Sequence, residues 1–263
     1  MPYISRAGAR IHFDHERSGG LRTVVLQHPL CSEPGCFEET SLKRTFLEAG
    51  YNVILPTSIA HGASSSPRDP ARYQLAERAA DVLAILDELG VERTAYVGYS
   101  MGTWIGCGLI AAAPERIVGA SFGGFDPLRG AHSCGIPRAV TRSKFGRLLL
   151  GVYALWPESR IDIKRCDIPS LQQCFDALYE PMPRITQLRH PHLPLHFWST
   201  HGDFYTPKMK RIAALLEAPI DLFDGHHFTA SSDERFVECI FAHVDAAWER
   251  TLAAKTPDQR ERM

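Results

Sequence analysis

The sequence predicts an α/β protein with a mostly parallel sheet that is covered by helices on both faces. Short continuous apolar segments recur along the chain, which is typical of strands buried on both faces. Segments with a helical period of apolar residues separate them, and glycine or proline often marks where a segment ends. Strands and helices that alternate in this way form a parallel sheet.

The first half of the chain is expected to supply a hairpin, two buried strands and two helices. In order, these are a hairpin over residues 4–14, a strand over 23–27, a helix over about 37–49 and a strand over 51–55. The clearest helix then follows over 75–89. Its apolar residues lie on one face of a 3.6-residue period, and Gly90 stands where the helix would end.

The second half continues the alternation around one interruption. Strands are expected over 94–99, 117–122, 193–199 and 220–223, and helices over 101–113, 208–217 and 234–247. Residues 127–193 are rich in proline and aromatic residues without a strong strand pattern, so they are predicted to form a helical cap. Residues 1–126 and 194–263 would then form the core. Because ligands bind at the carboxyl ends of parallel strands, the cap would cover the site.

The composition indicates neither a nucleic acid nor a membrane as the partner. The formal net charge of −1 favours neither nucleic acid nor an anionic membrane. The first residues lack the apolar stretch of a secretory signal, and no stretch approaches the roughly 20 apolar residues of a membrane span. The seven cysteines form no CxxC pair, so neither a metal site nor a disulfide framework is predicted. We therefore expect a cytoplasmic protein.

A nucleophile elbow is predicted at Gly98–Gly102 (GYSMG), which matches the pattern G-x-S-x-G. The motif needs a strand before it and a helix after it, and the predicted elements supply both. A second match, Gly119–Gly123 (GASFG), is followed by a glycine and by Asp126-Pro127, where a helix cannot begin. Ser100, rather than Ser121, is therefore the expected nucleophile.

A serine nucleophile needs a base within hydrogen-bond reach, and after this elbow the partners follow in the order acid, then histidine. His226 follows the last predicted strand and is the expected base, with His227 as the alternative. Asp203 follows the strand before it and is the expected acid, with Asp126 as its rival. The carboxylate would orient the imidazole and stabilise its protonated form.

The oxyanion hole requires two backbone N–H groups. Met101, the residue after the nucleophile, should supply one of them. The loop after the strand over 23–27 should supply the other. Because Pro29 has no N–H, Leu30 is the expected donor, with Cys31 as the second candidate.

With these motifs the chain resembles the α/β-hydrolase superfamily over nearly its whole length. Four blocks carry the resemblance, namely LQHPL, PTSIAHGASSSP, VGYSMG and the late pair HGDFYTP and DGHHF. The sequence is most similar to small bacterial serine esterases and cofactor-free haloperoxidase-like hydrolases. The resemblance implies a triad of Ser100, Asp203 and His226, oxyanion donors at Leu30 and Met101, and no cofactor.

Three positions depart from the pattern of the family. His28-Pro29 stands where the family usually has His-Gly, and Pro56-Thr57 stands where Pro-Asp is common. The residues Ile59-Ala60-His61-Gly62 stand where the family often has Arg before Gly-His-Gly. Relatives with an aspartate nucleophile, such as haloalkane dehalogenases and epoxide hydrolases, are disfavoured because residue 100 is serine.

The function that these features predict is hydrolysis of a small carboxylic ester or lactone through an acyl-enzyme on Ser100. Apolar cap residues, among them Phe145, Tyr153 and Trp156, would line a pocket for an acyl chain or an aromatic group. Thioester, amide or peracid chemistry remains an alternative, as does a ligand receptor of the same fold. A GxGxxA match at residues 106–111 lies inside a predicted helix and so does not indicate a dinucleotide site.

Overall fold

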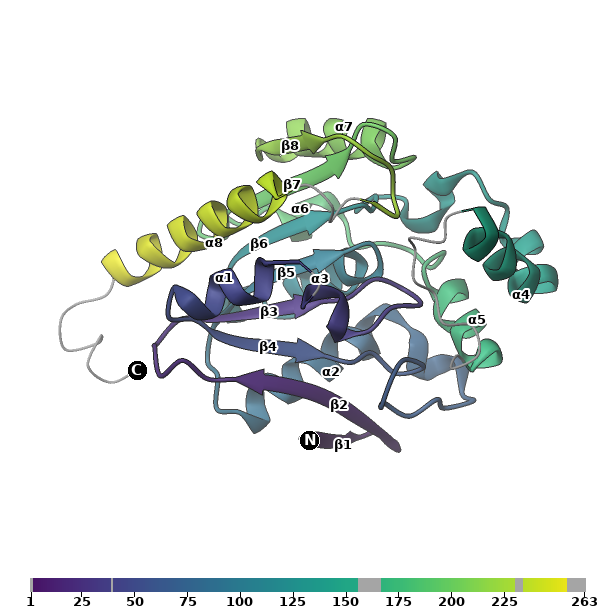
Figure 1. Ribbon diagram of the computed structural model, residues 1–263, viewed down its shortest axis with the longest axis horizontal. Helices are drawn as coiled ribbons and strands as arrows, with labels where there is room; N and C mark the ends of the chain where they lie inside the picture. The colour runs from purple at the N-terminus through teal and green to yellow at the C-terminus, as the bar shows by residue number, and fades with distance from the viewer. Residues whose placement is uncertain (1, 39, 156–166, 230–233, 255–263) are drawn as a thin grey trace.

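The computed structural model describes residues 2–38, 40–155, 167–229 and 234–254, which form one sheet between two layers of helices (Figure 1). The strands are β1 (Tyr3–Arg6), β2 (Ala9–Glu16), β3 (Thr23–Gln27), β4 (Asn52–Pro56), β5 (Thr94–Tyr99), β6 (Ile117–Gly123), β7 (Leu195–Thr200) and β8 (Ile220–Phe223). Across the sheet they follow the order β1-β2-β4-β3-β5-β6-β7-β8. Pairs β1/β2 and β2/β4 are antiparallel, and the pairs from β4 to β8 are parallel.

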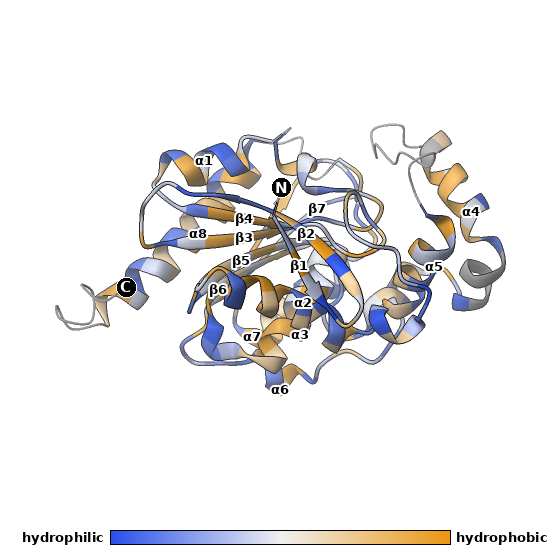
Figure 2. Cartoon of the chain, turned by 90° about the horizontal axis from the view of Figure 1, so that it is seen from below, coloured by the Kyte–Doolittle hydropathy of each residue, from blue (hydrophilic) through white to orange (hydrophobic). Residues whose placement is uncertain are grey.

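Helices cover both faces of the sheet and bury its apolar side chains. One face carries α1 (Leu42–Glu48) and α8 (Arg235–Ala253), and the other carries α2 (Leu75–Glu88), α3 (Met101–Ala112), α6 (Ile185–Leu188) and α7 (Thr206–Leu216) (Figure 2). Each face has its own core cluster, and the fully buried central strands contribute to both. No helix in the described part of the chain is long and apolar enough to cross a membrane.

The regular elements that the structure describes between β6 and β7 are all helices. They are the short η4 (Gly130–Cys134), α4 (Arg138–Leu155), α5 (Ile168–Ala177) and α6. Helices α4 and α5 lie beyond the carboxyl ends of the parallel strands (Figure 1). The division of the chain into a core and a cap stays a prediction, but the placement of these two helices is what a cap requires.

The α/β-hydrolase fold predicted from the sequence is confirmed, and several strands begin and end at the expected residues. The first helix is the clearest difference, because it was expected from about residue 37. Residues Pro34–Phe37 instead form a single 3₁₀ turn, and α1 begins only at Leu42. Thr40 Oγ1 accepts a hydrogen bond from the Leu42 N–H at 3.4 Å, and such side-chain bonds compete with the helical pattern.

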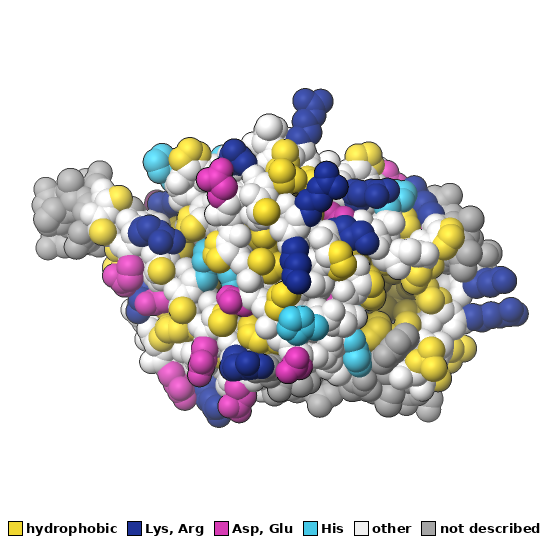
Figure 3. Space-filling model, turned by 90° about the horizontal axis from the view of Figure 1, so that it is seen from above, with side chains coloured by type: hydrophobic (Ala, Val, Ile, Leu, Met, Phe, Trp, Pro, Cys, Tyr) yellow, Lys and Arg dark blue, Asp and Glu magenta, His cyan; other side chains and the backbone are white. Residues whose placement is uncertain are grey.

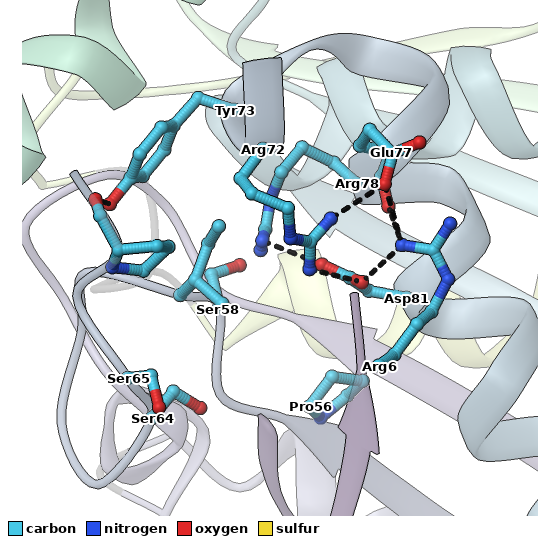
Figure 4. A network of polar contacts seen from close by, with 12 residues as sticks. Arg6, Pro56, Ser58, Ser64, Ser65, Arg72, Tyr73, Glu77, Arg78 and Asp81 are labelled. Atoms are coloured by element: carbon cyan, nitrogen blue, oxygen red, sulfur yellow. Dashed lines mark hydrogen bonds and ion pairs between the residues drawn. The ribbon is translucent and has the colours of Figure 1, made fainter. Parts of the chain in front are cut away.

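A buried ion network ties the edge hairpin to helix α2 (Figure 4). The Asp81 carboxylate accepts hydrogen bonds from three guanidinium groups, those of Arg6 and Arg72 at 2.9 Å and that of Arg78 at 2.8 Å. Glu77 binds Arg6 at 2.8 Å and Arg72 at 2.7 Å, and its hydrogen bond with Arg6 is the main reason that its pKa is lowered. Arg78 and Asp81 are each only 2% exposed, so their charges depend on one another.

Removal of the shared carboxylate should therefore destabilise the fold strongly. Asp81→Asn leaves the buried Arg78 guanidinium without its counter-charge, and the free energy of unfolding should fall by about 3–5 kcal/mol. Asp87→Asn is the matched control, because Asp87 pairs with Arg116 on the surface and should contribute less than about 1 kcal/mol. Urea unfolding of both variants measures this, and equal losses would contradict the assignment.

Candidate active site

Ser100 occupies a strained turn between β5 and α3. Its φ of 52° and ψ of −111° are rare for a residue with a side chain, and such strain costs of order 1–3 kcal/mol. The flanking glycines explain how the turn closes. A Cβ on Gly98 would lie 2.5 Å from the Gly102 carbonyl, and a Cβ on Gly102 would lie 2.2 Å from the Gln27 carbonyl oxygen. The sequence motif therefore reflects close backbone contacts.

Hydrogen bonds from neighbouring elements hold this turn. The Ser100 N–H donates to the Gly123 carbonyl at the end of β6, at 2.8 Å. Thr103 Oγ1 lies 2.9 Å and 2.7 Å from the carbonyl oxygens of Gly98 and Gly123. The Tyr96 hydroxyl donates to the Gly102 carbonyl at 2.7 Å. Both ends of the elbow are thus fixed to the sheet.

His227 is the histidine that reaches the serine. Its Nε2 atom lies 3.2 Å from Ser100 Oγ, and its Nδ1 atom lies 2.8 Å from Asp203 Oδ2. The expectation that His226 would make these contacts is wrong, and the alternative residue occupies the position. The His226 Nδ1 atom instead accepts a hydrogen bond from the Phe228 N–H at 3.3 Å, inside its own turn.

The conformation of the loop after β8 determines that His227, rather than His226, faces Ser100. Gly225 has a φ of 117°, and its carbonyl accepts a hydrogen bond from the Gly202 N–H at 2.9 Å, which joins this loop to the one that carries the acid. The next turn is closed by Thr229, whose Oγ1 accepts from the His226 N–H at 2.9 Å. Adjacent residues of a loop have no fixed side-chain period, so the sequence could not separate the two histidines.

Asp203 lies at the carboxyl end of β7, as expected, and is 3% exposed. Besides His227, it accepts a hydrogen bond from the Tyr205 N–H at 2.8 Å through its other carboxylate oxygen. Its rival, Asp126, is used elsewhere. The Asp126 carboxylate accepts from the Leu128 N–H at 2.9 Å and from the Ser133 hydroxyl, so it closes the turn after β6.

Two aromatic rings stack on the His227 imidazole. The Tyr99 ring stacks on it with centroids 5.3 Å apart, and the Phe204 ring does so at 4.8 Å. Tyr99 itself stacks on Trp198 at 5.0 Å, and its hydroxyl donates to the His227 carbonyl. This stack restricts the imidazole to the plane that faces both Ser100 and Asp203. Sequence reasoning missed Phe204, although it directly follows the predicted acid.

The second G-x-S-x-G match also lies in a chain of serine, histidine and carboxylate. Ser121 Oγ is 2.9 Å from His196 Nδ1, and His196 Nε2 is 2.9 Å from Asp221 Oδ2. Ser121 lies within strand β6 and is fully buried, so no substrate can reach its hydroxyl. Exposure and backbone geometry, rather than residue types alone, separate the two serines.

The two expected oxyanion donors lie at the end of β3 and the start of α3. Residue Gln27 pairs with Gly98 in the sheet, so the loop that follows β3 runs beside the elbow. Helix α3 begins at Met101, whose N–H therefore has no partner within the helix. In the other loop, the Cys31 N–H donates to His61 Nε2 at 3.0 Å. Cys31 is thus engaged, which leaves Leu30 as the better candidate for the second donor.

Comparisons with known proteins agree with this fold. Residues 22–122 match the model of the alpha/beta hydrolase fold family. The enol-lactonase from Burkholderia xenovorans LB400 superimposes with a TM-score of 0.77 and 21% identity, over 93% of this chain and 100% of that one. The chain therefore has the α/β-hydrolase fold.

Curated proteins similar to this chain align with it over short segments. Epoxide hydrolase A of Mycobacterium tuberculosis is 36% identical over 55 residues, which are 21% of this chain and 17% of that protein. A putative non-heme chloroperoxidase of Synechocystis is 33% identical over 106 residues, which are 39% of this chain and 37% of that protein. The aligned segments thus span well under half of either relative.

Of the predicted substrate-binding residues, Phe145 and Tyr153 belong to helix α4, which lies beyond the strand ends. Phe145 is 2% exposed and packs against Phe175 of α5, with ring centroids 5.4 Å apart. Trp156 and the side chain of Tyr153 lie outside the described part of the structure. Figure 3 shows a hollow with hydrophobic side chains on its walls. Among the described residues, no three His, Cys, Asp or Glu side chains come together as metal ligands.

Two buried histidines lie at the loop after β3, residues 28–31, which carries the expected donor Leu30 and is here called the oxyanion loop. His28 belongs to this loop, and His61 contacts it. His28 is fully buried, and burial lowers its pKa to about 4. His61 is 5% exposed, and burial holds its pKa well below the usual value, with His28 as a further cause. Both imidazoles are therefore neutral near neutral pH, and each can accept a hydrogen bond through one ring nitrogen.

Stability should consequently fall on acidification between about pH 6.5 and pH 4. An unfolded histidine binds a proton near pH 6.5, whereas His28 does so only near pH 4 in the folded chain. In that window the unfolded chain binds more protons, so the free energy of unfolding decreases as the pH falls, by about 3 kcal/mol for His28 alone. His28→Gln should remove this part of the pH dependence in urea unfolding at several pH values.

The exposed His192 provides the control for the effect of replacing a histidine by glutamine. His192→Gln should leave the pH dependence of unfolding as it is in the unmodified chain. An unchanged slope in His28→Gln would show that the buried imidazole does not take up its proton on unfolding, against the prediction.

Proposed function

We propose that this protein is a serine hydrolase that cleaves a small carboxylic ester or lactone through an acyl-enzyme on Ser100. The observation that carries the proposal is the hydrogen-bonded chain from Ser100 Oγ through His227 to Asp203, with distances of 3.2 Å and 2.8 Å. A nucleophile, a base and a group that orients the base are the three parts that acyl transfer through serine requires. They meet at the carboxyl ends of the parallel strands, where ligands bind in such sheets.

The proposed reaction begins when Ser100 Oγ attacks the acyl carbonyl while His227 Nε2 accepts the hydroxyl proton. Asp203 holds the Nδ1–H of the imidazole and stabilises the imidazolium ion that forms. The N–H groups of Leu30 and Met101 stabilise the negative charge that develops on the carbonyl oxygen. His227 then passes the proton to the leaving alcohol and activates a water molecule, which releases the acid and restores Ser100.

Small esters and lactones are the substrate class that the site supports best. The enol-lactonase among the structural neighbours acts on such a bond, and residue 100 is serine rather than the aspartate of epoxide hydrolases. Phe204 is 42% exposed while it stacks on His227, so its outer face can contact the acyl group or the leaving group. The hydrophobic walls of the hollow in Figure 3 suit an apolar substituent.

The two adjacent histidines allow a paired test with a p-nitrophenyl ester. His227→Asn should lower kcat by roughly 10²–10⁴-fold, because the general base is lost. His226→Asn should change kcat by less than about tenfold, because His227 and not His226 contacts Ser100 and Asp203. Initial rates over a range of ester concentrations separate kcat from KM for both variants.

The opposite ranking of the two histidine variants would return the role of the base to His226. If the unmodified protein turns over neither p-nitrophenyl esters nor simple lactones, the proposed activity is wrong. A ligand receptor of the same fold would then fit better.

A further inference from the structure

Two buried histidines join the oxyanion loop to the loop after β4 by reciprocal hydrogen bonds. His28 belongs to the oxyanion loop, and its Nε2 atom accepts from the Ser58 N–H of the other loop at 3.0 Å. His61 belongs to that other loop, and its Nε2 atom accepts from the Cys31 N–H of the oxyanion loop at 3.0 Å. The two rings meet edge to face with centroids 5.0 Å apart.

Each imidazole can make these bonds in only one protonation state. His28 Nδ1 lies 2.8 Å from the Pro29 carbonyl oxygen, and His61 Nδ1 lies 3.0 Å from the Ile59 carbonyl oxygen. Since a carbonyl only accepts, both Nδ1 atoms carry the proton and both Nε2 atoms are free to accept. Burial, the mutual proximity of the rings and the cation of Arg78 all favour the neutral form.

The bond to Cys31 falls at the strained point of the loop. Cys31 has a φ of 61°, which a residue with a side chain adopts only when its surroundings enforce it. With the Cys31 N–H directed to His61, the preceding N–H, that of Leu30, is the one that can face the elbow. Across the described residues, no acceptor within the protein is assigned to the Leu30 N–H. The bond to His61 fixes the Leu30–Cys31 peptide plane, and it thereby restrains the Leu30 backbone on which the direction of the Leu30 N–H depends.

We propose that His61, braced by His28, is a positioning residue that holds the oxyanion loop in its competent form by accepting the Cys31 N–H. This inference rests on the proposed serine-hydrolase function and adds a requirement to it. His61 touches neither substrate nor the triad, so it acts only through the loop. Loss of its acceptor should weaken stabilisation of the transition state while leaving the binding of the substrate in its ground state nearly unchanged.

Two substitutions at His61 separate its two hydrogen bonds. His61→Asn keeps a polar group at the position of Nδ1 for the Ile59 carbonyl but is too short to reach Cys31. His61→Gln places an amide oxygen at about the reach of Nε2 and can still accept from the Cys31 N–H. For ester hydrolysis, His61→Asn should lower kcat by roughly 10²–10³-fold, the usual loss for one oxyanion donor, with KM within about threefold. His61→Gln should stay within about tenfold of the unmodified protein.

A boronic acid that adds to Ser100 supplies the second readout, because its tetrahedral adduct resembles the transition state. Its affinity should fall in His61→Asn in parallel with kcat and recover in His61→Gln. His12→Leu is the matched control. His12 is another buried histidine that binds the loop after β4, because its Nδ1 lies 2.9 Å from Thr57 Oγ1, but its bond is to Thr57 and not to Cys31. This variant should lose stability without a comparable loss in kcat or in boronate affinity.

Equal activity in His61→Asn and His61→Gln would overturn the proposal, as would an equal loss in His12→Leu. A further measurement uses the unmodified protein, so its result does not depend on whether any variant folds. The ¹⁵N chemical shifts of the imidazole of His61 should identify the Nδ1–H tautomer, and an Nε2–H tautomer would rule out the bond to Cys31. If the unmodified protein neither hydrolyses esters nor binds the boronate, the proposed function fails, whereas the tautomer still tests the bond.

Discussion

The site depends on the strained backbone of Ser100 more than on any other feature. A φ of 52° places its hydroxyl beyond the end of the central strand, and the cost is offset by the hydrogen bond to β6 and by the close contact of Gly102 with Gln27 of β3. Both neighbours of β5 take part, so the elbow requires the sheet to be assembled. Strand order and register thus determine the geometry of Ser100.

The other residues of the site lie around Ser100 on loops that are joined to one another by hydrogen bonds. The loop with Asp203 and the loop with His227 are joined through Gly202 and Gly225, and the oxyanion loop is joined to the loop after β4 through His28 and His61. The aromatic stack on His227 adds a third restraint. Such pre-organisation lowers the reorganisation needed during the reaction, which is how oriented groups contribute most to catalysis.

Features with a local cause in the chain were predictable from the sequence. Buried strands, the amphipathic α2 and the elbow glycines arise from periodicity and from covalent constraints, so the fold and the position of Ser100 could be inferred. Which of two adjacent histidines faces Ser100 depends on the conformation of one loop, and the sequence does not determine it. The sequence therefore favoured His226, whereas the structure has His227 in this position. The roles of Phe204 and His61 were not foreseen, because ring stacking and a bond between distant loops leave no local pattern.

Covalent trapping of the nucleophile tests the proposed role of Ser100 most directly. A fluorophosphonate probe should add once to the folded protein, and peptide mapping by mass spectrometry should place the adduct on Ser100. The same reaction should be slower by at least about a hundredfold in His227→Asn, because the hydroxyl is activated by that imidazole. An adduct on a different serine, no adduct, or an equal rate in the variant would contradict the central claim.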